Sequence, residues 1–339
     1  MKKNSVTFDD IAKYTGFSKT TISRYFNKPE SITPENQEKI RKALIALDYK
    51  ENKVAKILAN GESQFVGVLI PSLYLHYFGE MVNQLLLTYE KYGYKFLLFV
   101  GNQKPDVERR YIQELLSYQV EGLLVMSHTL PSKELSSFPI PVVSIEREDS
   151  YTSSVRCDNR AGALMAVKLL EEKGCEVFLH LNTPTAKNVP AYERLVAFQE
   201  YCSLHELPHQ VFIQESGQSP ALVQKDMEVA FQKIEASYAG KKKGIFLSDD
   251  TRANAMLNQI VRKYGALPEE YRLVGFDNSP ISESAIYPIT TVSQQIPLMA
   301  QEAIRLLSEL IKIKKESPDK PLPLIHKVVA PQIFIRETT

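Results

Sequence analysis

The sequence lacks the features that would place it in a membrane or outside the cell. No apolar run approaches the ~20 residues that a membrane-spanning helix needs, and the first ten residues, MKKNSVTFDD, lack the apolar stretch of a secretory signal. Only three cysteines occur, at scattered positions (Cys157, Cys175, Cys202), which argues against a disulfide framework and against a cysteine-based metal site. We therefore expect a cytoplasmic protein with no metal and no other cofactor.

Motifs of two large enzyme classes are also missing. The chain has neither a Walker-type Gly-Lys-Ser/Thr loop nor the Gly-x-Ser-x-Gly pattern of serine hydrolases. Phosphoryl transfer and serine hydrolysis thus lack their usual anchors, and we expect no enzymatic activity. An enzyme nevertheless remains an alternative. A test of whether the purified protein consumes any sugar would distinguish an enzyme from a protein that only binds its ligand.

Length and composition indicate a soluble protein with more than one folding unit. The chain has 339 residues, of which 44% are hydrophobic and 24% charged. The net charge of +1 hides an asymmetry, because residues 1–63 hold 12 Lys and Arg against 8 Asp and Glu, whereas the remainder holds 29 against 32. A small basic module suits a polyanionic partner, although a solvated surface gives the same count.

Residues 1–50 are predicted to form a small all-α domain of three helices. Apolar residues at helical spacing follow Asp9 and Asp10, Gly16 allows a sharp turn, and Ser18 caps a second helix over about 19–26. A third helix begins at Thr33, Pro34 and Glu35. This is the helix-turn-helix pattern, whose second helix enters the major groove of DNA. Its polar face presents Lys19, Thr20, Thr21, Ser23 and Arg24.

The resemblance to a known family extends over about fifty residues without a gap. The segments VTFDDIA, TGFSKTTISR, LDY and NKVAKILA resemble the DNA-binding domain of the lactose/galactose repressor family. The resemblance implies a homodimer on palindromic operator DNA. It places Lys19, Thr20 and Arg24 at base-contacting positions, and Thr7, Ser18, Ser23 and Asn27 at phosphate-contacting positions.

Residues 51–63 are predicted to form a short hinge helix and linker. A helix of this length is marginal alone in water, so it needs DNA and a partner copy for support. The resemblance implies that Leu58 wedges into the minor groove, with Asn52, Lys53 and Ala55 beside it. The alternative is a plain interdomain linker with one buried leucine.

Residues 64–339 alternate short apolar runs with amphipathic stretches, which predicts parallel sheets with helices on both faces. Strands are expected at 66–70, 96–100, 123–126, 142–145, 177–181, 245–247, 273–276 and 328–335, and helices near 81–92, 107–118, 161–173, 191–205, 222–238 and 253–264. The resemblance implies an α/β periplasmic-binding-protein-like domain for effector binding and dimerisation, with two doubly wound subdomains. We expect lobe one at about 64–158 plus 293–325, and lobe two at about 159–292 plus 326–339.

The resemblance also implies a sugar-binding cleft between the lobes. Its positions here are Ser72, Leu75, Tyr77, Phe78, Ser127, Glu146, Arg194, Ser248, Asp249, Asp277 and Gln294. Independently of it, Asp277 ends a predicted parallel strand, where ligands bind in such sheets. Core packing is an equal alternative for Tyr77 and Phe78, and a surface salt bridge is the alternative for Arg194.

These observations predict a transcription regulator, most simply a repressor of sugar-utilisation genes that a small sugar controls allosterically. Short fragments, among them Met126-Ser127-His128 and Ile145-Glu146-Arg147, resemble sucrose-operon repressors, so sucrose or a related fructoside is the first candidate effector. The alternatives are a sugar-binding protein without a regulatory role and a regulator that responds to a non-sugar metabolite. No heptad pattern for a tetramer follows the final predicted strand, which favours a dimer.

Overall fold

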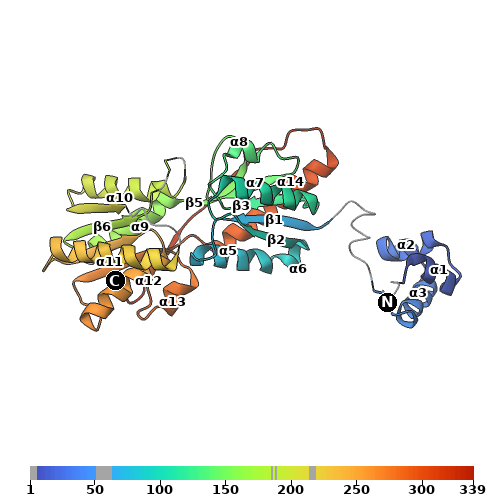
Figure 1. Ribbon diagram of the computed structural model, residues 1–339, viewed down its shortest axis with the longest axis horizontal. Coiled ribbons are helices and arrows are strands. Elements are labelled where there is room, and N and C mark those ends of the chain that lie inside the picture. The colour runs from blue at the N-terminus through green and yellow to red at the C-terminus, as the bar shows by residue number, and fades with distance from the viewer. Residues whose placement is uncertain (1–5, 51–62, 185, 188, 214–218) are drawn as a thin grey trace. The chain divides into compact units, whose positions relative to one another are not determined.

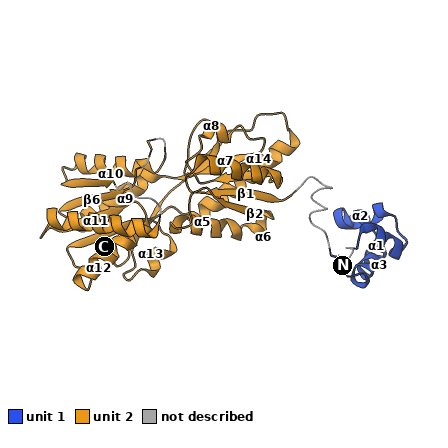
Figure 2. Ribbon diagram, in the orientation of Figure 1, with its two compact units in different colours: residues 1–62 blue, residues 63–339 orange. Residues whose placement is uncertain are grey.

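The computed structural model describes residues 6–50, 63–184, 186–187, 189–213 and 219–339. The chain divides into two compact units, unit 1 (Met1–Glu62) and unit 2 (Ser63–Thr339), which Figure 2 distinguishes by colour. Within the described residues, no helix is long and apolar enough to cross a membrane.

Unit 1 is the predicted bundle of short helices. It contains α1 (Phe8–Thr15), α2 (Lys19–Asn27), the 3-10 turn η1 (Pro29–Ser31) and α3 (Pro34–Ala46). Thr7 and Asp10 form a capping box at the start of α1, and Gly16 ends that helix with a φ of 74°. Ile11, Ile22, Ile40 and Ala43 are buried between the helices, and this small core fixes the angle at which α2 is held.

Unit 2 contains two six-stranded sheets, one in each lobe. The lobe one sheet has the order β11-β5-β4-β3-β1-β2, and the lobe two sheet has the order β12-β10-β9-β8-β6-β7. All pairings are parallel except that of β12 with β10. The lobe one strands are β1 (Phe65–Ile70), β2 (Lys95–Val100), β3 (Gly122–Val125), β4 (Val142–Ile145), β5 (Ser153–Cys157) and β11 (His326–Val329). The lobe two strands are β6 (Val177–Asn182), β7 (His209–Ile213), β8 (Lys243–Leu247), β9 (Tyr271–Asp277), β10 (Thr290–Ser293) and β12 (Gln332–Phe334).

Helices cover both faces of each sheet, as Figure 1 shows. In lobe one they are α5 (His76–Leu87), α6 (Tyr89–Tyr92), α7 (Pro105–Ser117), α8 (Ser132–Leu135) and α14 (Ile296–Glu316). In lobe two they are α9 (Asn159–Glu172), α10 (Tyr192–Leu204), α11 (Pro220–Ser237), α12 (Asp250–Tyr264) and α13 (Pro280–Ser284). Each sheet thus has two apolar cores, with α5 and α14 opposite α7 in lobe one, and α9 and α10 opposite α11 and α12 in lobe two. The predicted fold class is confirmed.

The chain passes between the lobes three times, and the third passage corrects the predicted lobe boundary. The first two passages follow β5 and β10. The third lies between β11, which pairs with β5 in lobe one, and β12, which pairs with β10 in lobe two. Residues 326–329 therefore belong to lobe one, and the single strand expected over 328–335 is two strands, because Pro331 cannot donate a ladder hydrogen bond.

Candidate DNA-binding face and effector cavity

The predicted DNA-contacting residues lie on the exposed side of α2 and at the helix starts of unit 1. Lys19, Thr20 and Arg24 are exposed on α2, and an ion pair of 3.1 Å joins Lys19 Nζ to Asp9 Oδ2. Such an exposed pair is worth little, so Lys19 is available for a nucleic acid. This face therefore presents the exposed cations Lys19 and Arg24 on a regular helix.

Of the predicted phosphate-contacting residues, two are helix caps and two lie on α2. Thr7 and Ser18 cap α1 and α2, so their hydroxyls lie beside the first backbone N–H groups of those helices. Asn27 is exposed and donates from Nδ2 to Ser23 Oγ at 3.3 Å. The hinge positions Asn52, Lys53, Ala55 and Leu58 lie outside the described residues.

A cavity of about 500 Å³ lies between the lobes of unit 2. Its walls come from strand ends and helix starts of both sheets, as expected for parallel α/β folds. The described lining residues are Leu75, Tyr77, Phe78, Gln103, Met126, His128, Ile145, Glu146, Asn182, Thr183, Pro184, Ala186, Val189, Ala191, Arg194, Ser248, Asp249, Arg252, Asp277 and Gln294.

Nine of the eleven predicted effector residues line this cavity, and Ser72 and Ser127 do not. Ser72 Oγ accepts the Tyr74 N–H at 3.0 Å and so stabilises the turn after β1. Ser127 is buried and donates from Oγ to Glu108 Oε1 at 2.5 Å. Both hydroxyls thus take part in local hydrogen bonds, and neither residue is among those that line the cavity.

Arg194 on α10 joins the two lobes at the back of the cavity. It is 6% exposed, donates from Nε to Asn159 Oδ1 at 2.6 Å and from Nη1 to the Ser248 carbonyl at 2.7 Å, and lies 4.0 Å from Glu146 Oε2. Its guanidinium also stacks 3.6 Å from the ring centroid of Phe276. The surface salt bridge considered from the sequence is therefore wrong, because this arginine is buried and held from four sides.

Glu146 follows β4 in lobe one and faces this arginine. Its Oε1 accepts the Cys157 N–H at 2.6 Å, and its Oε2 accepts Asn159 Nδ2 at 2.8 Å. Burial raises the pKa of Glu146, while Arg194 and these hydrogen bonds act to lower it. The residue has a φ of 57°, a left-handed conformation that costs energy for a residue with a Cβ.

Asp277 ends β9 on the lobe two side. Its Oδ1 accepts Gln294 Nε2 at 2.6 Å, and its backbone has a φ of 109°. Burial raises the pKa of Asp277 well above its ordinary value, against the opposing effect of Arg194. Both Glu146 and Asp277 thus have a strained backbone. Such strain is common among residues at binding sites.

The third carboxylate, Asp249, is the N-cap of α12. Its Oδ1 accepts the Arg252 N–H at 2.9 Å, and its Oδ2 accepts Ser248 Oγ at 3.1 Å and pairs with Arg252 Nη1. Sequence reasoning missed Arg252, although its place three residues after the predicted effector residue Asp249 was a usable signal.

Apart from Glu146, the residues with which lobe one lines the cavity are largely apolar. Tyr77 is 8% exposed, packs in the lobe one core and also lines the cavity, so core packing holds and its contact with a ligand stays a prediction. Its ring meets that of Phe78 edge to face at 5.3 Å. Leu75, Met126 and Ile145 add to the apolar part of this side, and Gln103, His128 and Glu146 are its polar residues.

Three buried polar atoms of lining residues have no hydrogen-bond partner within the described protein: Tyr77 Oη, Asn182 Nδ2 and Gln294 Oε1. Unpaired buried polar groups are costly and therefore rare. Sequence reasoning missed Asn182, which ends β6 just as Asp277 ends β9, and the strand-end rule would have found it.

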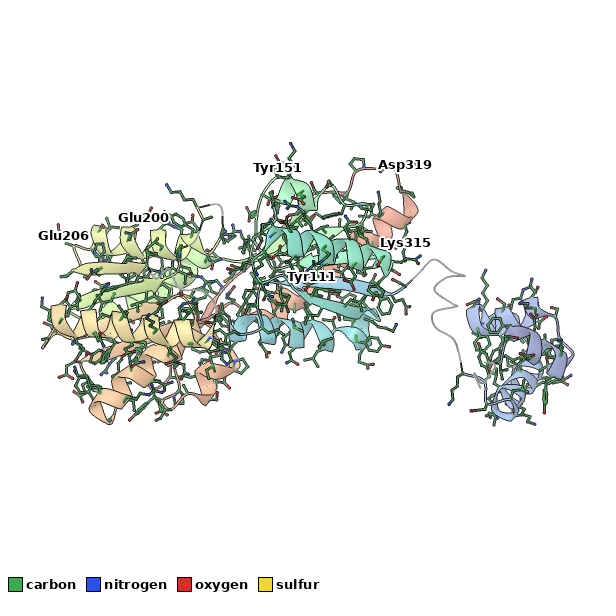
Figure 3. All side chains as sticks on the ribbon, viewed as in Figure 1. Tyr111, Tyr151, Glu200, Glu206, Lys315 and Asp319 are labelled. Atoms are coloured by element: carbon green, nitrogen blue, oxygen red, sulfur yellow. The ribbon has the colours of Figure 1, made fainter. Side chains whose placement is uncertain are left out.

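One segment of lobe two matches the zinc-protease pattern, but its structure does not suit a zinc site. Residues 205–209 read HELPH and so match His-Glu-x-x-His. However, α10 ends at Leu204 and β7 begins at His209, so the two histidines do not share a helix face. The described residues contain no cluster of His, Cys, Asp and Glu that could hold a metal ion. Glu206 lies at the outer end of lobe two, away from lobe one (Figure 3).

Comparison with known proteins agrees with both units. Residues 7–52 match the model for bacterial regulatory proteins of the lacI family, and residues 167–339 match the periplasmic binding protein-like domain. The ribose operon repressor of Halalkalibacterium halodurans is 28% identical over 98% of this chain and 97% of its own length. The sucrose operon repressor of Pediococcus pentosaceus is 29% identical over 90% of this chain and 92% of its own length.

Solved structures share the fold. The lac repressor dimer bound to operator and the anti-inducer ONPF has a TM-score of 0.81 at 20% identity and covers 99% of both chains. A ribose-bound lacI family regulator from Enterococcus faecalis has a TM-score of 0.67 at 22% identity, covering 81% of this chain and 98% of its own. The chain thus belongs to the lactose/galactose repressor family, in which a lacI-type DNA-binding domain precedes a periplasmic binding protein-like domain.

Proposed function

We propose that the protein is a transcription regulator of sugar-utilisation genes, and that a small sugar in the cavity of unit 2 controls its affinity for a palindromic operator. The carrying observation is the set of unpaired buried atoms on Tyr77, Asn182 and Gln294. A sugar hydroxyl both donates and accepts, so one ring supplies the donor that Gln294 Oε1 needs and the acceptor that Asn182 Nδ2 needs. The names of the relatives make ribose and sucrose the first candidates.

The mechanism requires that the sugar prefer one arrangement of the lobes. Glu146 comes from lobe one, Arg194 and Asp277 come from lobe two, and Gln294 lies in a segment that links them. A ligand bonded to all of these groups stabilises the lobe spacing that fits it best. Only such a difference in affinity between two states shifts the operator-binding equilibrium. The DNA contacts that we propose are those of Lys19, Thr20 and Arg24 to bases.

The test combines a sugar panel with operator binding. Thermal-shift measurements against mono- and disaccharides identify the effector, and electrophoretic shifts of genomic fragments with that sugar then measure its effect on DNA affinity. Arg194→Ala is expected to abolish the sugar response while retaining operator binding. Because that change also unpairs buried groups, Asn182→Ala serves as a milder second variant, and Asn83→Ala, on the exposed side of α5, is the control. A normal sugar response in both cavity variants would overturn the proposal.

The non-regulatory alternative, a sugar-binding protein alone, is separated by the same assay. It predicts a thermal shift with sugar but no preference for any genomic fragment over random competitor DNA. The exposed cations of α2 favour the regulator.

A further inference from the structure

The charges that line the cavity point to the kind of sugar it takes. The described lining contains three carboxylates, Glu146, Asp249 and Asp277, but only two cationic side chains, Arg194 and Arg252, and no lysine. We infer that the effector is an electrically neutral sugar or polyol and that the cavity rejects the phosphate ester of the same sugar. This inference rests on the proposed function, because it concerns the same site.

The charge of Arg194 is already partly balanced by the groups around it. Its Nε and Nη1 donate to Asn159 and to the Ser248 carbonyl, and Glu146 lies against the remaining side of the charge. Its flat face is covered by Phe276 at 3.6 Å. A phosphate could reach only the N–H groups left on Nη1 and Nη2, and there it would lie beside the Glu146 carboxylate, whose Oε2 is 4.0 Å from Nη2.

Arg252 and the start of α12 are neutralised in a similar way. Asp249 pairs with Arg252 Nη1 and also accepts the Arg252 backbone N–H. A helix N-terminus attracts anions when its N–H groups and dipole are unopposed. Here a carboxylate already occupies that position, so this helix start offers a phosphate little attraction.

A phosphate ester carries a charge of about −1.5 to −2 at neutral pH. Inside the cavity it would lose hydration and meet the Glu146 and Asp249 carboxylates, each beside an arginine, so desolvation and like-charge repulsion are only partly offset. A neutral ring meets none of these costs. Its hydroxyls donate to Asp277 and Gln294 and accept from Asn182, while its C–H face packs on Tyr77 and Phe78.

The test compares each neutral sugar with its own ester. Isothermal titration of the full-length protein would use D-ribose with D-ribose 5-phosphate, D-fructose with D-fructose 6-phosphate, and sucrose with sucrose 6-phosphate. We expect at least one neutral sugar to bind at least 100-fold more tightly than its ester. An ester that binds as tightly as its sugar would overturn the inference and leave the proposed function standing. Binding of neither class would overturn both.

The variant Asp249→Asn tests the physical reason. Asparagine caps helices as well as aspartate does, so α12 should keep its start while Arg252 loses its counter-charge. We expect the preference for sugar over ester to fall at least tenfold. An unchanged preference would mean that Asp249 does not exclude the anion. Asn83→Ala, on the exposed side of α5, is the control, and it should leave the preference unchanged.

Discussion

Asn159 hydrogen-bonds both to the Glu146 carboxylate of lobe one and to the Arg194 guanidinium of lobe two. We expect its removal to lower the stability of the protein measurably. Asn159 is 1% exposed, donates to Glu146 Oε2 at 2.8 Å and accepts Arg194 Nε at 2.6 Å. Each hydrogen bond to a charged group is worth roughly 1.5–3 kcal/mol. Loss of both in Asn159→Ala should therefore lower the free energy of unfolding by about 3–6 kcal/mol.

The same change should alter the pH dependence of stability. Burial raises the pKa of Glu146, and the bond from Asn159 lowers it. Without that bond the folded-state pKa rises further. A carboxyl with a raised folded-state pKa favours its protonated form, so stability falls as pH increases from its ordinary pKa to the folded-state value. The deficit of Asn159→Ala should consequently be larger at pH 8 than at pH 5.

Urea unfolding of the full chain, followed by circular dichroism at both pH values, measures this effect. Titration with the effector should also show at least a tenfold loss of affinity, because Arg194 and Glu146 are no longer held in position. Asn83→Ala is the matched control on an exposed helix face. A deficit below 1 kcal/mol, or one equal at the two pH values, would refute the assignment of Asn159 as the positioning residue.

Three further predictions concern other described residues. His180 is fully buried, contacts the Phe246 carbonyl through Nδ1 at 3.0 Å and has no partner for Nε2. Burial lowers its pKa to about 4, so the wild type should lose up to about 3 kcal/mol as pH falls from 6.5 to 4, and His180→Phe should remove that part of the loss in urea titrations. Burial raises the pKa of Asp250 to about 7, and its Oδ1 lies 2.5 Å from Thr291 Oγ1. Stability should fall as pH rises from about 4 to 7, by roughly 2–4 kcal/mol, and Asp250→Asn should flatten that slope; an unchanged slope would assign it to another group. Finally, Arg24→Ala should weaken specific operator binding by about 1–3 kcal/mol and random DNA by much less, whereas equal losses in a competition assay would make Arg24 a phosphate contact.

The sequence predicted the elements whose pattern is strong and local. The core strands β1, β4, β6 and β9 are continuous apolar runs bounded by turn residues, and the caps Ser18 and Thr33 begin helices as expected. In contrast, β5 reads SSVRC and β10 reads TTVS. Such short polar runs become strands because neighbouring strands accept their backbone hydrogen bonds, a tertiary effect that local pattern does not contain.

The longest helix, α14, was not predicted at all. It spans Ile296–Glu316, starts with a proline in its first turn and buries an apolar stripe in lobe one. Its buried residues recur at helical spacing, so the sequence does contain the periodicity that predicts this helix.

The site was predictable where a residue type and a strand end coincided. Asp277, Glu146 and Ser248 follow strands, and the family resemblance named them together with Arg194. Asn159 was missed because its role depends on Glu146 and Arg194, which lie far away in the sequence and meet only in the folded chain. Ser127 also follows a predicted strand, but it donates to Glu108 and does not line the cavity. No local feature of the sequence distinguishes a residue that lines the cavity from one that does not.

The three connections between the lobes are short, and this limits how the lobes can move. One residue separates β5 from α9, two separate β10 from α14, and two, including Pro331, separate β11 from β12. The connecting segments are also tied to one another, since the Asp158 N–H donates to the Val329 carbonyl at 3.0 Å. Segments of one or two residues cannot lengthen, so the lobes can swing about this bundle but cannot slide apart. Gln294 lies in one of these connections, whereas the contact of 3.0 Å from His76 Nδ1 to Thr251 Oγ1 joins the start of α5 in lobe one to α12 in lobe two. A ligand that bonds to Gln294 is therefore anchored in the bundle about which the lobes swing.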